Sequence, residues 1–86
     1  MWSQGCGVGQ SDACQRYVAC QRATDDAFRL SPGTDTADFE EPGQCWRGSI
    51  EQADRCTALC EDARAALAAA AAELGVDLAS CAPPAT

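Results

Sequence analysis

The fold is decided by residues 49–74, which read SIEQADRCTALCEDARAALAAAAAEL. Ser49 with Gln52 three positions later is a capping box, the sequence signature of a helix N-terminus. Gly75 is a suitable residue to end the helix, because glycine readily adopts left-handed backbone geometry. Apolar residues recur between these signals at helical spacing and define one inner face, Cys56, Leu59, Cys60, Ala63, Leu67, Ala70 and Leu74. The stretch therefore predicts one long amphipathic helix.

A second helix is predicted from about Asp12 to Arg29. Ser11 is its expected N-cap, and Ser31-Pro32-Gly33 is expected to stop it, because a residue before proline avoids helical geometry. Its inner stripe comprises Ala13, Cys14, Tyr17, Cys20, Thr24, Ala27 and Phe28. Residues 31–44 follow as a long acidic loop, from which we expect Phe39 to turn back to the core.

These elements predict an all-α fold, a disulfide-stapled antiparallel helical hairpin with a long acidic loop and a short returning tail. The hairpin domain should occupy residues 11–81, between a flexible N-terminal segment at 1–10 and a flexible tail at 82–86. No span has the roughly 18 apolar residues that a transmembrane helix needs. Met1–Gly5 has neither the charged start nor the apolar centre of a signal peptide, so the cysteines alone argue for export.

Seven cysteines in 86 residues point to a disulfide framework. A chain of this size buries a small core, which scarcely offsets the entropy of ordering the chain. Each disulfide would add about 2–4 kcal/mol, mainly by restricting the unfolded chain. Such cross-links persist in oxidising compartments, so we expect a secreted, periplasmic or surface-anchored protein.

The cysteines can pair in two ways that suit two antiparallel helices. Cys45 and Cys81 cannot join, because a continuous helix between them would hold them roughly 35–40 Å apart. The first scheme leaves Cys6 unpaired and joins Cys20–Cys45, Cys14–Cys56 and Cys60–Cys81. The second leaves Cys45 unpaired and joins Cys14–Cys60, Cys20–Cys56 and Cys6–Cys81. We favour the first, because its odd cysteine lies in the N-terminal segment.

Cys6 has three candidate fates in an oxidised protein. Gly5-Cys6-Gly7 resembles the start of a mature bacterial lipoprotein, where glycine often precedes the lipidated cysteine. A free or intermolecular thiol and a disulfide to Cys81 are the other two. A lipid on Cys6 would be the one expected link to a membrane.

The cysteine pattern as a whole resembles that of a known group. CQRYVAC at residues 14–20, Cys45-Trp46, CTALC at 56–60 and the final Cys81 are similar to the motifs of small cysteine-rich predicted lipoproteins of myxobacteria. The likeness covers most of the chain and implies an exported helical hairpin with three disulfides. Because that group has no assigned activity, it implies no catalytic residues. The absence of lysine, asparagine and histidine suggests GC-rich codon usage, which also favours a bacterial source.

Composition argues against several classes of function. Thirteen carboxylates against six arginines give a net charge of -7, which offers no basic stripe to a nucleic acid. Without histidine the chain lacks the commonest general base, and it has no Cys-x-x-Cys redox motif. We therefore expect no enzymatic activity and no cofactor. The alternative is a thiolate site for zinc or Cu(I), formed by Cys14, Cys20, Cys56 and Cys60.

The acidic loop is the expected contact surface. Its exposed carboxylates would be Asp35, Asp38, Glu40 and Glu41, and Trp2 is an aromatic residue with no evident core role. We therefore predict a small exported, non-enzymatic binding or surface module, monomeric or weakly associating, with an unidentified protein partner.

Overall fold

The computed structural model describes residues 9–82, and the structural statements below refer to that part of the chain. It holds two α-helices, α1 (Asp12–Ala27) and α2 (Ile50–Glu73), and three short 3-10 helices, η1 (Ala37–Phe39), η2 (Gln44–Trp46) and η3 (Ala79–Cys81). Residues 9–82 contain no strand, and three disulfides join the elements. The prediction of an all-α, disulfide-stapled helix pair is confirmed.

Both α-helices begin where the sequence predicts, because a serine caps each of them. Ser11 Oγ accepts from the Cys14 amide at 3.3 Å, and Ser49 Oγ accepts from the Gln52 amide at 3.1 Å. Each bond satisfies one of the amides that a helix N-terminus leaves without an intrahelical partner. The Gln52 side chain does not turn back to Ser49 but donates to the carbonyl of Gln44 at 3.2 Å.

Helix α2 ends in the Schellman geometry that its glycine permits. Gly75 has φ 75°, in the left-handed region. The Val76 amide donates to the Ala71 carbonyl at 2.8 Å, and the Gly75 amide donates to the Ala72 carbonyl at 3.1 Å. These bonds satisfy carbonyls that the helix end would otherwise leave without donors.

Helix α1 ends in the same geometry without a glycine. Arg29 occupies the left-handed position with φ 56°. The Leu30 amide donates to the Asp25 carbonyl at 2.9 Å, and the Arg29 amide donates to the Asp26 carbonyl at 3.2 Å. The regular helix therefore stops at Ala27, slightly before the predicted end.

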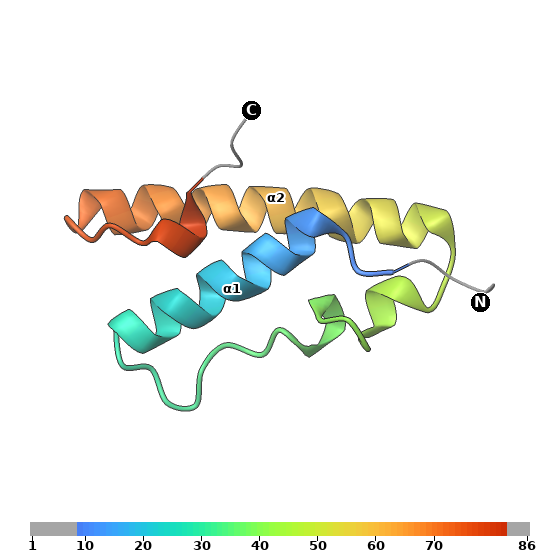
Figure 1. Cartoon of the computed structure of the whole chain (residues 1–86), viewed down its shortest axis with the longest axis horizontal. Helices are drawn as coiled ribbons and strands as arrows, with labels where there is room; N and C mark the ends of the chain where they lie inside the picture. Colours follow the sequence, from blue (N-terminus) through green and yellow to red (C-terminus); the bar gives the residue numbers. More distant parts are fainter. Residues whose placement is uncertain (1–8, 83–86) are drawn as a thin grey trace.

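The two α-helices run in the same direction. In Figure 1 the sequence colours of α1 and α2 both progress from right to left. Cys14 is bridged to Cys60, whereas Cys20 is bridged to Cys81, whose carbonyl accepts from Arg64 Nη1 at 2.8 Å. A step along α1 from Cys14 to Cys20 thus moves along α2 from Cys60 towards Arg64.

The direction of α2 explains the long connection at residues 28–49. The 16 residues of α1 extend over roughly 24 Å, and the chain must return over that distance before α2 begins. Figure 1 shows the connection following α1 back to its start. The helix pair was predicted correctly, but its antiparallel direction was wrong, because residues 28–49 lead the chain back along α1 before α2 begins.

The core lies where the first half of α1 meets α2 and η2. Its buried members are Cys14, Tyr17, Val18, Cys45, Trp46, Ala53 and Cys60, with Phe39, Cys56, Ala63 and Leu67 packed against them. Phe39 therefore turns back to the core as predicted. The predicted inner faces extend too far towards the C-terminal ends of both helices, where Ala27, Phe28, Ala70 and Leu74 are exposed. Leu59 is also exposed, although the next residue, Cys60, is buried.

The six cysteines of the described residues are all paired, in a pattern that neither proposed scheme contains in full. The disulfides are Cys14–Cys60, Cys20–Cys81 and Cys45–Cys56, with Cα–Cα distances of 5.0, 4.6 and 6.0 Å. The first scheme selects the six cysteines that are paired but has all three pairs wrong. Of the three pairs in the second scheme, only Cys14–Cys60 is present. Cys6 lies outside the described residues.

Candidate binding pocket

The acidic loop is fastened along its second half to α1 and η2. The Phe39 ring meets the Tyr17 ring edge-on, with centroids 5.5 Å apart. Trp46 Nε1 donates to the Glu40 carbonyl at 3.0 Å, and Gln10 Nε2 donates to the Phe39 carbonyl at 2.8 Å. Because these bonds hold the backbone on both sides, residues 39 and 40 have a fixed position against α1.

A ladder of polar side chains fastens the first half of the loop. Tyr17 Oη donates to Gln21 Oε1 at 3.0 Å, and Gln21 Nε2 donates to Asp25 Oδ1 at 3.1 Å. Asp25 Oδ2 accepts from the Thr34 amide at 2.7 Å, and Oδ1 accepts from Thr34 Oγ1 at 3.2 Å. The four-residue spacing of Tyr17, Gln21 and Asp25 places them in a row on α1, so one row of side chains bonds to the returning loop.

The same ladder shifts the pKa of two of its groups. The Thr34 amide bond lowers the pKa of the Asp25 carboxyl, and the bonds from Gln21 and Thr34 Oγ1 also favour its ionised form against the opposing effect of burial. Burial raises the pKa of Tyr17, and the negative charge of Asp25 raises it further. At neutral pH the ladder therefore holds a neutral phenol and an ionised carboxylate.

Arg22 and Thr36 hold the side chain of Glu40. Arg22 Nη2 lies 3.3 Å from Glu40 Oε2, and Thr36 Oγ1 donates to the same oxygen at 2.7 Å. Thr36 is buried, whereas the Arg22 side chain is 66% exposed. Glu40 is thus oriented from both sides, and Arg22 still presents donors to solvent.

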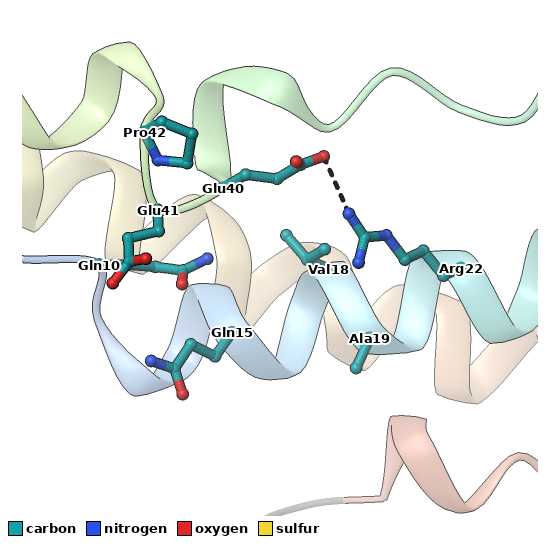
Figure 2. A pocket seen from close by; sticks show the side chains of 8 residues that line it. All are labelled: Gln10, Gln15, Val18, Ala19, Arg22, Glu40, Glu41 and Pro42. Atoms are coloured by element: carbon teal, nitrogen blue, oxygen red, sulfur yellow. Dashed lines mark ion pairs between the residues drawn. The ribbon is translucent and has the colours of Figure 1, made fainter.

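A surface pocket of about 320 Å³ opens between α1 and the loop. Its lining combines amide, aliphatic and charged side chains, namely Gln10, Gln15, Val18, Ala19, Arg22, Glu40, Glu41 and Pro42. Figure 2 shows Val18 between the Arg22–Glu40 ion pair on one side and Glu41 with Gln10 on the other. The pocket is therefore apolar in its middle and charged at its two ends.

Gly43 sets the position of the pocket wall beside Pro42. Its amide donates to the Glu40 carbonyl at 2.8 Å, and a Cβ atom at Gly43 would collide with the backbone of Ala37 and Asp38. Only glycine lets the turn after Pro42 pack this closely against η1.

The predicted contact residues have different environments. Asp35 is exposed, and its Oδ1 accepts from the amide of Ala37, the first residue of η1, at 3.0 Å. Asp38 is exposed outside the pocket lining, whereas Glu40 and Glu41 line the pocket. The structure thus brings together only two of the four predicted carboxylates. Trp2, the fifth candidate, lies outside the described residues.

Sequence reasoning missed the residues that α1 contributes to the pocket. Val18 and Arg22 are one helical turn apart, a spacing that places them on the same face of α1. That face lies beside the predicted inner stripe, and the apolar Val18 outside that stripe was the available sign that a second segment covers it. The pocket could not be located without knowing that the loop returns along this face.

The thiolate metal site is not formed in this structure. Cys14, Cys20, Cys56 and Cys60 are all in disulfides, and no group of three potential ligands gathers within residues 9–82. A sulfur in a disulfide is not the thiolate that zinc or Cu(I) binds. The pairing favours the disulfide interpretation of the cysteines over the metal-binding one.

No protein-family model matches the chain, and no curated protein or solved structure matches it.

Neither α-helix described here is long and apolar enough to cross a membrane. Three intramolecular disulfides are typical of a chain that folds in an oxidising, extracytoplasmic environment.

Proposed function

We propose that this protein is a small exported, non-enzymatic binding module whose contact surface is the pocket between α1 and the acidic loop. The observation that carries the proposal is the fastening of the loop. Bonds from Gln10, Trp46 and Arg22 hold residues 39 and 40 while a pocket of about 320 Å³ stays open beside them. A site held in shape before its ligand arrives loses less entropy on binding.

The disulfides contribute to the same rigidity. Cys45–Cys56 joins η2 to α2 directly after the loop, and Cys14–Cys60 joins α1 to α2 near the pocket. The two sides of the pocket are therefore connected through α2 by covalent bonds. The module would keep its binding surface outside the cell without a large core.

The proposal includes a tether at Cys6. Gly5-Cys6-Gly7 and the similarity to myxobacterial predicted lipoproteins support lipidation there, on a bacterial surface. Intact mass of the protein isolated from its native host tests the tether. A chain that begins at Cys6 and carries a diacylglycerol there, with both features lost in a Cys6→Ser variant, supports the tether, and an unmodified Cys6 in the exported protein contradicts it.

A fragment screen by nuclear magnetic resonance tests the binding function. We expect hits to shift the amides of Val18, Ala19 and Glu41 and to lose affinity in an Ala19→Trp variant, because Ala19 is an exposed lining residue. The control is Ala66→Trp on the exposed face of α2, which should bind fragments like the wild type. Hits spread over the surface, or unaffected by Ala19→Trp, would contradict the proposal.

A further inference from the structure

The pocket carries an excess of negative charge. Two carboxylates, Glu40 and Glu41, and one guanidinium, Arg22, belong to its lining. The Arg22–Glu40 contact is the one ion pair within residues 9–82, so it leaves the exposed Glu41 carboxylate without an ionic partner there. The net charge of -7 adds a long-range attraction for basic molecules.

The middle of the pocket suits an aliphatic chain. Val18 and Pro42 supply apolar surface, and in Figure 2 Val18 lies between the two charged ends. Lysine and arginine side chains combine an aliphatic stem with a charged head, so each matches an apolar surface that leads to a carboxylate. About 320 Å³ is near the lower limit for ligand pockets, which suits one long side chain better than a bulky ligand.

Arg22 gives the pocket a second recognition element. Its side chain is 66% exposed, and Nη2 is the atom paired with Glu40. Because a guanidinium has five N–H donors, Arg22 keeps donors for an additional acceptor. A peptide carbonyl next to a bound basic side chain is such an acceptor, so Arg22 would fix the direction of the peptide backbone.

We propose that this pocket receives a lysine or arginine side chain from a partner protein. The cationic head pairs with Glu41, the aliphatic stem lies on Val18 and Pro42, and the adjacent peptide carbonyl accepts from Arg22. This inference rests on the proposed binding function and adds the chemical class of the partner, a protein with an exposed basic segment.

Four blocked tripeptides, acetyl-Gly-Xaa-Gly-amide, test the assignment when titrated into the labelled full-length protein. Xaa is arginine, lysine, citrulline or glutamate, and citrulline keeps the shape of arginine without its charge. We expect the arginine and lysine peptides to shift the Val18, Ala19 and Glu41 amides. Citrulline should bind about two- to fivefold more weakly, as expected for the loss of an exposed ion pair, and the glutamate peptide more weakly still.

Two variants test whether the Glu41 carboxylate is the group that pairs with the positive charge of the bound peptide. In the Glu41→Gln variant the affinity for the arginine peptide should fall by a similar factor, to no more than the affinity for the citrulline peptide. This loss of preference is expected if the peptide's guanidinium interacts directly with the Glu41 carboxylate. Glu61→Gln makes the same charge change on the exposed face of α2 and should leave the preference intact.

The possible failures are distinguishable from those of the proposed function. Equal binding of the arginine, citrulline and glutamate peptides at the pocket overturns the cation assignment but keeps the pocket as a binding site. A charge preference that survives in Glu41→Gln places the cation elsewhere and also overturns the assignment. The absence of any shift at the pocket overturns it as well, and the fragment screen with Ala19→Trp then decides separately whether the pocket binds other ligands.

Discussion

Cys20 and Cys81 are 61 positions apart in the sequence, and their disulfide brings their Cα atoms to 4.6 Å. Both residues are almost fully buried, and Thr24 Oγ1 lies 3.9 Å from Cys81 Sγ. The bond attaches the returning tail to the middle of α1, and the Cys81 carbonyl also accepts from Arg64 of α2. One residue near the end of the described chain thus contacts both helices.

Removing Cys20–Cys81 should destabilise the protein more than removing Cys45–Cys56. The disulfides close loops with sequence separations of 61 and 11, and the chain-entropy estimate gives about 4 kcal/mol for the longer loop and about 3 kcal/mol for the shorter one. Denaturant unfolding of the two serine double variants, followed by circular dichroism, measures the difference. A larger loss of unfolding free energy in the double variant that replaces Cys45 and Cys56 would show that native contacts outweigh loop entropy here.

Arg29→Gly should stabilise the protein by about 0.5–1 kcal/mol, because Arg29 ends α1 in the left-handed region with φ 56°, where glycine carries no steric cost. Gly75→Ala is the matched opposite change. A Cβ at Gly75 meets no atom within 4 Å, so its destabilisation of about 1 kcal/mol would reflect φ 75° alone. Thermal unfolding of both variants checks whether Arg29→Gly stabilises the protein and Gly75→Ala destabilises it. A destabilised Arg29→Gly variant would contradict the left-handed conformation of Arg29.

Asp25→Asn should remove part of the pH dependence of the protein's stability. The pKa of Asp25 is lowered in the folded protein, chiefly by the Thr34 amide, so its contribution is present above the unfolded value of about 3.9. That contribution is lost as the pH falls through the lowered folded pKa. The melting temperature of the wild type should therefore exceed that of Asp25→Asn by a constant amount between about pH 5 and 7, and the gap should narrow below about pH 4.

Asp26→Asn controls for removing one charge from the same turn of α1, where Asp26 is exposed. If the difference in melting temperature between the wild type and Asp25→Asn stayed constant into strong acid, the hydrogen bonds to the ionised Asp25 carboxylate would not contribute to stability, and the prediction would be wrong.

Phe39→Ala should release the loop from α1. The substitution removes the edge-on contact with Tyr17 and should cost about 2 kcal/mol, below the range for fully buried phenylalanines because Phe39 is only half-buried. Trp46, whose Nε1 donates to the Glu40 carbonyl, should then become more exposed to water.

Fluorescence of Trp46 measures this release in a Trp2→Phe background, which leaves a single tryptophan. We expect a red-shifted emission maximum and faster quenching by acrylamide in the Phe39→Ala variant. The exposed Phe28 serves as the control, since Phe28→Ala should leave the emission unchanged. An unchanged spectrum in Phe39→Ala would mean that the loop is held without the aromatic contact.

The two α-helices were predictable because their signals are local, whereas the three 3-10 helices were not predicted. Ser11 and Ser49 cap the helices through bonds three residues away, and Gly75 ends α2 within one turn. The end of α1 was harder to predict, since Arg29 adopts a conformation that arginine rarely takes.

The arrangement of the elements depended on one long-range choice. With α2 assumed antiparallel, Cys20 was paired with Cys45 or Cys56, whereas the observed direction brings Cys81 to it. The length of residues 31–44 was the available signal, because antiparallel helices need only a short connection. The pocket depends on the same choice, since Val18 is covered by a loop that returns along α1.

Tryptic peptide mapping of the unreduced protein tests the central structural claim, because cleavage after each arginine separates Cys20–Cys81 from the other two disulfides. The structure predicts residues 17–22 linked to residues 65–86, and a separate three-peptide assembly of 1–16, 30–47 and 56–64. Both species should be present before reduction and absent after it. Residues 17–22 linked to 30–47 or 56–64, or released as a free thiol peptide, would contradict the fold described here.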